Sequence, residues 1–112
     1  DVGSTNRVRE VANYFNAEMV ICDKHRKRAN EIASMVVIGD VTGKDIVIVD
    51  DICDSGVTLT ELNDHFANML PKMRDNIKFA TLHQRAGSKL VPDFIGGYIT
   101  DGMWIVYPYE EF

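Results

Sequence analysis

Two adjacent carboxylates, Asp50 and Asp51, follow a short run of apolar residues. Residues 46–49 read Ile-Val-Ile-Val, and such a β-branched run predicts a central strand that is covered on both faces. Carboxylates at the tip of a buried strand can accept hydrogen bonds from sugar hydroxyls, or bind a magnesium ion that arrives with phosphates. We therefore expect the acidic pair to face a small molecule rich in hydroxyl or phosphate groups.

Small and polar residues follow the acidic pair, namely Asp54, Ser55, Gly56, Val57 and Thr58. Because a helical pattern begins after them, their backbone N–H groups would lie at a helix N-terminus, where the helix dipole favours an anion. The loop and the acidic pair together predict a site for a ribose phosphate. The GxxxxGK[ST] and GxGxxG spacings of other phosphate loops are absent. The alternative is that residues 54–56 only cap a helix and that the acidic pair is a solvated strand end.

Helix and strand patterns alternate along the chain, and the elements they predict must position this loop. Apolar residues at positions 8, 11, 12 and 15 predict an amphipathic helix over 4–15, and a second apolar stripe predicts a helix from about 57 to 71. Short apolar runs predict strands at 19–22, 35–38, 45–51 and 77–83, with one or two more over 98–107. This alternation predicts an α/β fold with an open, mostly parallel β-sheet flanked by helices.

The composition narrows the class of protein. The chain has 112 residues and a formal net charge of −5, so a nucleic-acid-binding domain is not expected. No apolar run is long enough to span a bilayer, and the two cysteines lack the spacing of a zinc or disulfide framework. We expect one domain over residues 1–112 in the cytoplasm. Because the chain begins at Asp1, within what resembles a binding loop, we also expect residues upstream of it.

The string over residues 46–58 resembles the phosphoribosyl-pyrophosphate (PRPP) motif of the type I phosphoribosyltransferase fold, which ribose-phosphate diphosphokinases share. The resemblance implies that Asp50 and Asp51 contact the ribose hydroxyls and that residues 54–58 cradle the 5-phosphate. It also implies Mg²⁺ as the cofactor, with Asp50 or Asp51 as its possible protein ligand, and a role in nucleotide biosynthesis.

Residues 1–54 resemble the catalytic half of ribose-phosphate diphosphokinase. The resemblance implies that a loop of Asp1, Val2, Gly3 and Arg7 binds diphosphate. It also implies that residues 23–28 form an exposed, mobile loop in which Lys24 and Arg26 are catalytic. A cationic loop that closes on substrate would stabilise the charge that phosphoryl transfer builds up. The alternative for this stretch is a solvated basic turn.

Residues 55–112 instead resemble purine phosphoribosyltransferases of the xanthine, guanine or hypoxanthine type. That resemblance implies that Arg85 meets an exocyclic oxygen of the base and that Trp104 and Ile105 line the base. The alternative is that the Trp104 segment packs in the core.

The first prediction is therefore a ribose-phosphate diphosphokinase, which makes PRPP from ATP and ribose 5-phosphate. A purine phosphoribosyltransferase that consumes PRPP is the second, and a non-catalytic PRPP-binding module is the third. In each case we expect small-molecule ligands, no nucleic acid or membrane as partner, and a homo-oligomer.

Overall fold

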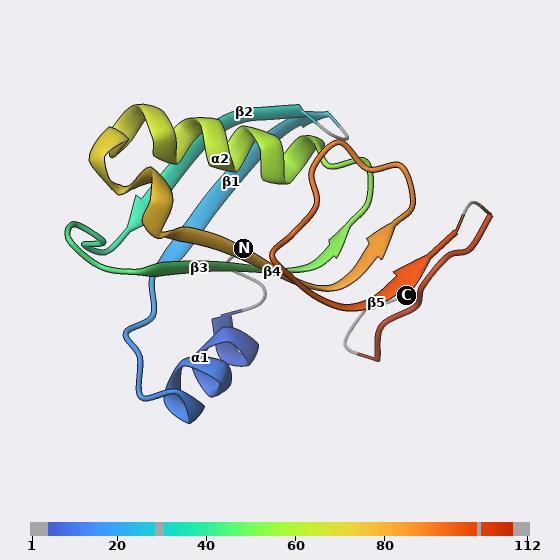
Figure 1. Cartoon of the computed structure of the whole chain (residues 1–112), viewed down its shortest axis with the longest axis horizontal. Coiled ribbons are helices and arrows are strands. Elements are labelled where there is room, and N and C mark those ends of the chain that lie inside the picture. Colours follow the sequence, from blue (N-terminus) through green and yellow to red (C-terminus); the bar gives the residue numbers. More distant parts are fainter. Residues whose placement is uncertain (1–4, 29–30, 101, 109–112) are drawn as a thin grey trace.

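A computed structural model describes residues 5–28, 31–100 and 102–108, and for residues 24–28 and 31–35 it describes the backbone. The elements in chain order are α1 (Thr5–Tyr14), β1 (Ile21–Arg28), β2 (Glu31–Ile38), β3 (Ile46–Cys53), α2 (Val57–Met69), the 3₁₀ helix η2 (Pro71–Asn76), β4 (Ile77–Arg85) and β5 (Phe94–Ile99). Strands β3, β4 and β5 form a sheet in that order, and β1 and β2 form a separate hairpin. In Figure 1, α2 lies over one face of the three-stranded sheet and α1 lies on the other side.

The core lies between α2 and the sheet. The apolar stripe of α2 consists of Leu59, Leu62 and Phe66, all buried, and it packs with Ile48 of β3 and Phe79 of β4. This stripe is the one that the apolar spacing predicted, so the helix prediction is confirmed. The helix ends at Met69, two residues earlier than expected, because the chain turns into η2 there.

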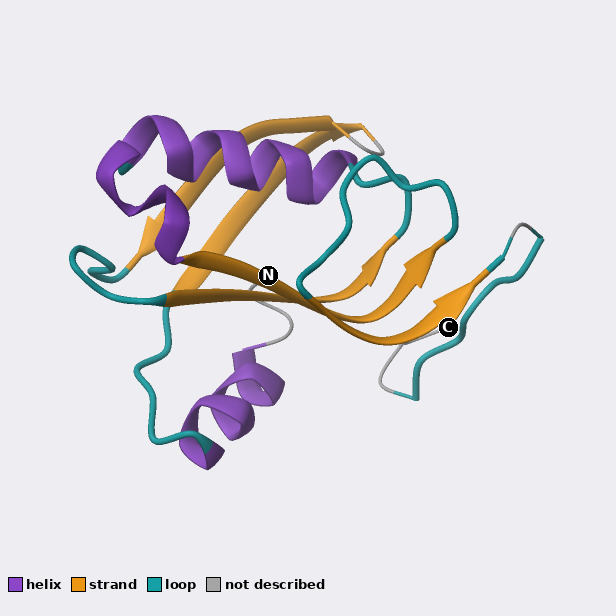
Figure 2. Cartoon of the chain, in the orientation of Figure 1, coloured by secondary structure: helices purple, strands orange, loops and turns teal. Residues whose placement is uncertain are grey.

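All three strands of the larger sheet run parallel. Asp50 of β3 pairs with Thr81 of β4, and Arg85 at the end of β4 pairs with Ile99 at the end of β5. The carboxyl ends of these strands therefore meet at one edge, and the prediction of an α/β fold with a mostly parallel sheet is confirmed. Figure 2 shows the loops that follow β3 and β4 side by side at this edge, next to the start of α2.

The basic stretch over residues 23–28 belongs to a strand, so the prediction of an exposed loop was wrong. Strand β1 pairs antiparallel with β2, from Ile21 opposite Ile38 to Arg28 opposite Glu31, with register shifts around Arg26. The prediction followed side-chain polarity, whereas a hairpin is held by the backbone hydrogen bonds of its two strands and does not need apolar side chains. The hairpin also extends β2 upstream of the predicted start at residue 35.

Strand β3 is an edge strand of the described sheet, and only one of its faces is covered. Val47 and Val49 point away from α2 and are 55% and 44% exposed. The prediction of a central strand covered on both faces was therefore wrong. A β-branched run indicates a strand, but the residue types alone do not place that strand within its sheet.

Of the one or two strands expected over residues 98–107, one is present, since β5 contains Tyr98 and Ile99, whereas residues 104–107 form no strand. In the described segment 102–108, the structure has a turn and otherwise irregular backbone. The apolar character of this segment has another cause, because Tyr107 is buried at 6% exposure without being part of a strand. Its side chain holds the segment against the sheet through hydrogen bonds that are described below.

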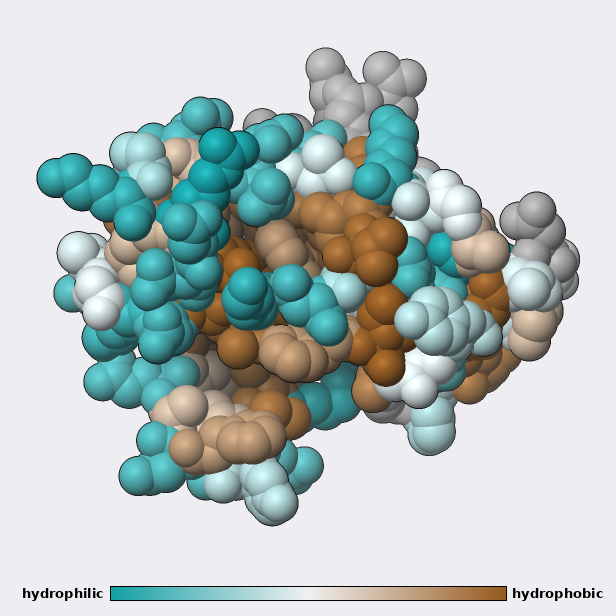
Figure 3. Space-filling view, in the orientation of Figure 1, coloured by the Kyte–Doolittle hydropathy of each residue, from teal (hydrophilic) through white to brown (hydrophobic). Residues whose placement is uncertain are grey.

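Helix α1 has the predicted position and amphipathic pattern, yet none of its residues is buried. Val11 and Phe15, at and just beyond its apolar stripe, are 44% and 70% exposed. Figure 3 shows this apolar surface over α1 at the bottom of the view. Among the described residues, no helix has both the length and the apolar character that crossing a bilayer requires.

Replacing Phe66 tests the position of the core. Phe66 is 1% exposed, so Phe66→Ala should lower the free energy of unfolding by about 3–5 kcal/mol through lost burial and a cavity. Phe15→Ala is the matched control, and because Phe15 is 70% exposed we expect a change within about 0.5 kcal/mol. Urea unfolding followed by circular dichroism measures both, and equal losses would contradict this core.

Candidate functional site

The acidic pair lies at the carboxyl end of β3. Successive side chains of a strand point to opposite faces, so Asp50 lies on the α2 side with Ile48, and Asp51 on the other side with Val49. Both carboxylates are half-buried, and the backbone N–H of Asp51 donates to Asp50 Oδ1 at 2.9 Å. The strand thus presents two acidic groups to two sides of its tip.

Burial raises the pKa of the Asp51 carboxyl above its ordinary value, and the neighbouring charge of Asp50 raises it further. Both causes act against the ionised form, which lacks water and faces a like charge. A hydroxyl donor or a cation near the pair would relieve this cost. The electrostatics therefore agree with a site for sugar hydroxyls or a divalent ion.

The loop between β3 and α2 turns at Gly56, which is buried, while Ser55 and Thr58 are half-buried. Gly56 adopts a left-handed conformation with φ of +87°, and the Val57 N–H donates to Ser55 Oγ at 3.3 Å. Among hydrogen bonds of the described residues, none uses the backbone N–H of Ser55 or Gly56 as its donor. These amides lie at the N-terminal end of α2, where the helix dipole favours an anion.

A second loop packs behind the first. The Lys89 N–H donates to the Ser55 carbonyl at 2.8 Å, and the Cys53 thiol donates to the Leu90 carbonyl at 3.3 Å. Burial raises the pKa of the Cys53 thiol, which fits a packed residue better than a nucleophile. No local motif in the sequence marks residues 86–90, so the packing of this loop on Ser55 and Gly56 was not predicted.

Arg85 connects the loop over residues 54–58, which we call the phosphate loop after its predicted role, to the residues that follow β5. Its Nε forms an ion pair with the Asp54 carboxylate, while Nη1 and Nη2 donate to the carbonyls of Thr100 and Met103 at 3.0 and 2.8 Å. The guanidinium was predicted to meet a base, and that role stays a prediction. Arg85 lies at the predicted edge of the sheet, where its guanidinium links Asp54 to the carbonyls of Thr100 and Met103.

Tyr107 holds the C-terminal segment against the acidic tip. Its hydroxyl lies 2.9 Å from His83 Nδ1 and donates to the Asp51 carbonyl at 3.3 Å. Trp104, three residues earlier, is 79% exposed, and Ile105 is half-buried. No sequence signal separated Tyr107 from its aromatic neighbours, since only the fold places it beside β3 and β4.

The other predicted site residues lie elsewhere. Arg7 is an exposed residue of α1, which lies across the sheet from α2 (Figure 1), while Asp1, Val2 and Gly3 lie outside the described residues. Lys24 and Arg26 lie in β1, where the structure describes the backbone. Their assignments to diphosphate binding and catalysis remain predictions.

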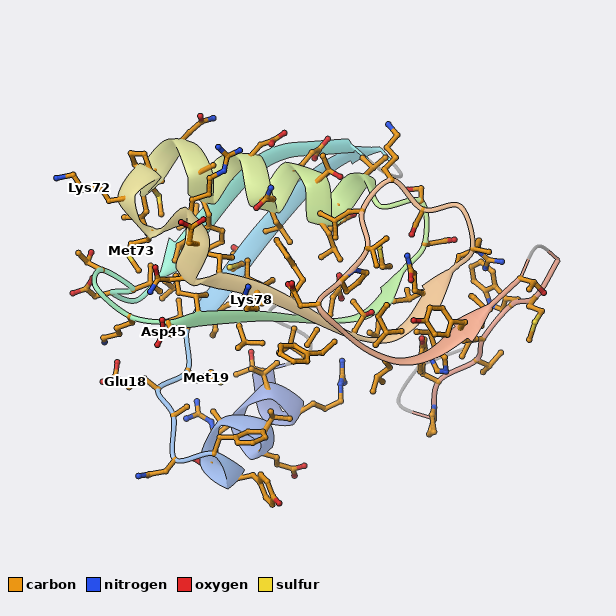
Figure 4. The ribbon with its side chains drawn as sticks, viewed as in Figure 1. Glu18, Met19, Asp45, Lys72, Met73 and Lys78 are labelled. Carbon is orange, nitrogen blue, oxygen red and sulfur yellow. The ribbon has the colours of Figure 1, made fainter. Side chains whose placement is uncertain are left out.

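A further group of charged residues lies at the opposite, amino end of the sheet, as the labels of Glu18, Asp45 and Lys78 in Figure 4 show. Asp45 accepts a hydrogen bond from Asn76 Nδ2 at 2.7 Å, and Glu18 forms an ion pair with Lys44. Because these contacts pair neighbouring loops on the exposed surface, we assign the group a structural role.

Comparison with known proteins decides the family. Over residues 1–105, the chain matches the phosphoribosyl transferase domain family. The chain belongs to this family. The phosphoribosyl transferase domain was expected from residues 46–58, and that expectation is confirmed.

Curated relatives of this phosphoribosyl transferase domain match about half of it. A ribose-phosphate pyrophosphokinase of Porphyromonas gingivalis is 50% identical over 64 residues, which are 57% of this chain and 20% of that protein. A ribose-phosphate pyrophosphokinase of Cereibacter sphaeroides is 54% identical over 59 residues, or 53% and 18% of the two chains. The matched part thus spans about a fifth of the length of these relatives.

Solved structures match over a larger part of the domain. A purine phosphoribosyltransferase from Pyrococcus horikoshii has a TM-score of 0.75 and 28% identity, and the match covers 98% of this chain and 72% of that one. A xanthine-guanine-hypoxanthine phosphoribosyltransferase of Helicobacter pylori has a TM-score of 0.57 and 18% identity over 90% and 66% of the two chains, which shows a shared fold.

Gly56 offers a test of the loop packing. A Cβ atom on Gly56 would lie 2.7 Å from the Lys89 nitrogen, whereas one on Gly43, which also has a positive φ, would meet nothing within 4 Å. Gly43→Ala should lower the free energy of unfolding by about 1–2 kcal/mol through backbone strain alone. Gly56→Ala should cost about 1–3 kcal/mol more because of overpacking. Urea unfolding compares the two, and equal losses would contradict the contact between the loops.

The raised pKa of Asp51 predicts how stability depends on pH. The folded state binds more protons than the unfolded state between the ordinary pKa of 3.8 and the raised value, so Asp51 lowers stability as pH rises through that window. Asp51→Asn should therefore be more stable than the wild type at pH 7. Unfolding curves at several pH values measure the difference, which should shrink toward acidic pH. A difference independent of pH would contradict the shift.

Proposed function

We propose that this domain binds PRPP and transfers its phosphoribosyl group to a purine base. The proposal rests on the position of residues 102–107. They lie at the same edge of the sheet as the acidic pair and the phosphate loop. Tyr107 bonds there to the Asp51 carbonyl, and Arg85 bonds to Asp54 and to the Met103 carbonyl. These contacts support the proposal, because they bring the residues proposed to bind the phosphate, the ribose and the base to one edge of the sheet.

The 5-phosphate would bind at the loop over residues 54–58. The N–H groups of Ser55 and Gly56 would donate to phosphate oxygens, and Val57 and Thr58 place the first turn of α2 beside the same anion. This grip does not require a surplus of basic residues, so it suits a chain with a net charge of −5.

The ribose hydroxyls would donate to Asp50 and Asp51. The same pair fits a Mg²⁺ ion, since this ion is commonly bound by one or two carboxylates together with substrate phosphates. Within the described residues, no group of three or more His, Cys, Asp or Glu side chains forms a metal cluster, so substrate oxygens and water would complete the shell. When bound, Mg²⁺ would neutralise the charge of the diphosphate.

The chemistry at C1 of the ribose needs alignment and charge stabilisation. The bond from C1 to the diphosphate oxygen breaks, the diphosphate leaves with the electron pair, and a base nitrogen forms the new bond to C1. Trp104 would stack on the base and Ile105 would line it, while Arg85 would face its exocyclic oxygen. The assignment of the diphosphate to Asp1, Val2, Gly3 and Arg7 stays a prediction that this proposal does not use, because Arg7 lies in α1, on the other side of the sheet from α2.

A second candidate is ribose-phosphate diphosphokinase activity, which the identity of 50% over 64 residues to a pyrophosphokinase favours. In that reaction the ribose 1-hydroxyl attacks the β-phosphate of ATP, and AMP leaves. Lys24 and Arg26 would stabilise the transferred charge. Both candidates need the same ribose phosphate site.

Two assays on the same protein separate the candidates. With PRPP, Mg²⁺ and hypoxanthine, guanine or xanthine, we expect a nucleotide and diphosphate as products. Formation of PRPP and AMP from ribose 5-phosphate and ATP, without transfer to a base, would instead indicate the diphosphokinase. Binding of PRPP in calorimetry with no turnover in either assay would indicate a binding module.

Replacing Trp104 tests whether Trp104 and Ile105 form a wall that lines the base. Because stacking on an aromatic ring contributes about 1–3 kcal/mol per base, Trp104→Ala should raise KM for the base about tenfold and leave KM for PRPP unchanged. Tyr98→Ala is the matched control, since Tyr98 is an exposed aromatic residue of β5 outside the proposed wall. If both variants changed KM for the base equally, Trp104 would not be the residue that stacks on the base.

A further inference from the structure

The loop over residues 86–90 lies directly behind the phosphate loop. The Lys89 N–H donates to the Ser55 carbonyl at 2.8 Å, and Gly56 packs so closely that a Cβ atom there would lie 2.7 and 2.8 Å from the nitrogens of Lys89 and Leu90. Figure 1 shows the two loops side by side above the carboxyl ends of β3 and β4. We call residues 86–90 the backing loop.

The hydrogen bond to Ser55 determines where the next amide points. A trans peptide is planar, and its C=O and N–H groups point in opposite directions. Because the Ser55 carbonyl points toward Lys89, the Gly56 N–H must point away from the backing loop. Gly56 is the N-cap residue of α2, so this N–H lies at the N-terminal end of the helix, on the side opposite to the backing loop.

Three side chains, those of Gln84, Ser88 and Cys53, hold the backing loop in place. Gln84 of β4 is buried at 6% exposure, and its Nε2 donates to Ser88 Oγ at 2.8 Å. The Ser88 hydroxyl in turn donates to the Leu90 carbonyl at 3.1 Å, and the Cys53 thiol donates to the same carbonyl at 3.3 Å. The Ser88 hydroxyl thus uses both its donor and an acceptor site, and it connects a rigid strand to the loop.

We propose that Gln84 and Ser88 are positioning residues for the 5-phosphate. They hold the backing loop, the Lys89 N–H then orients the Ser55–Gly56 peptide, and the Gly56 N–H faces the anion before it binds. This inference rests on the proposed function, because it assumes that the anion is the 5-phosphate of a ribose. A loop oriented in advance binds more tightly, since it loses less conformational freedom on binding.

Loss of the Ser88 hydroxyl should weaken phosphate binding without removing the site. In Ser88→Ala the Gly56 N–H should lose part of its orientation toward the charged phosphate, so ribose 5-phosphate binding should weaken about tenfold. Gln84→Leu should act in the same direction, and Ser88→Thr, which keeps the hydroxyl, should restore most of the affinity. Thr42→Val, which removes an exposed hydroxyl on a different loop, is the control.

The experiment combines calorimetry with ribose 5-phosphate and ¹⁵N relaxation of the ligand-free protein. We expect Ser88→Ala to bind ribose 5-phosphate more weakly and to show greater backbone mobility at Gly56. Ser88→Thr should restore binding, and Thr42→Val should change neither the binding nor the mobility. If the wild type fails to bind ribose 5-phosphate, the proposed function fails. If the wild type binds and Ser88→Ala binds equally well, or if Gly56 mobility is unchanged, the positioning role is wrong.

Discussion

Parallel pairing of β3 with β4 is the constraint on which the rest of this domain depends. Only in a parallel sheet do the segments after consecutive strands leave from the same edge. Here that edge collects the acidic pair after β3, the backing loop after β4 and the segment after β5. Residues as distant in sequence as Asp51 and Tyr107 become neighbours for this reason.

The candidate site consists largely of backbone groups, and backbone N–H groups that stay available to a ligand do not stabilise the fold. A phosphate loop that keeps its N–H groups available cannot use them to stabilise itself, so other contacts must hold its shape. The Ser55 carbonyl, the left-handed Gly56 and the Cys53 thiol all contact the backing loop. The loop that would bind the ligand is therefore stabilised from the side that the ligand does not touch.

The two halves of the chain have different relatives, and the sheet edge explains how they can work together. The motif over residues 46–58 lies in β3, the loop after it and the start of α2. The segment after β5 lies beside it, held by Arg85 and Tyr107. Under the proposed function, one ribose phosphate site could serve either reaction, because the groups around C1 would come from other segments.

The sequence by itself determined the family, the α/β class and the apolar stripe of α2, because each depends on local spacing. It misjudged the basic stretch in β1, the covered faces of β3 and the segment at 104–107. It did not reveal the backing loop. Each of these depends on pairing between segments distant in sequence, and residue types do not encode which partner lies opposite. Only the tertiary structure decided that Ser88 lies in the loop packed on Ser55 and Gly56 and that Tyr107 lies beside the tip of β3, since these contacts arise where separate strands end together.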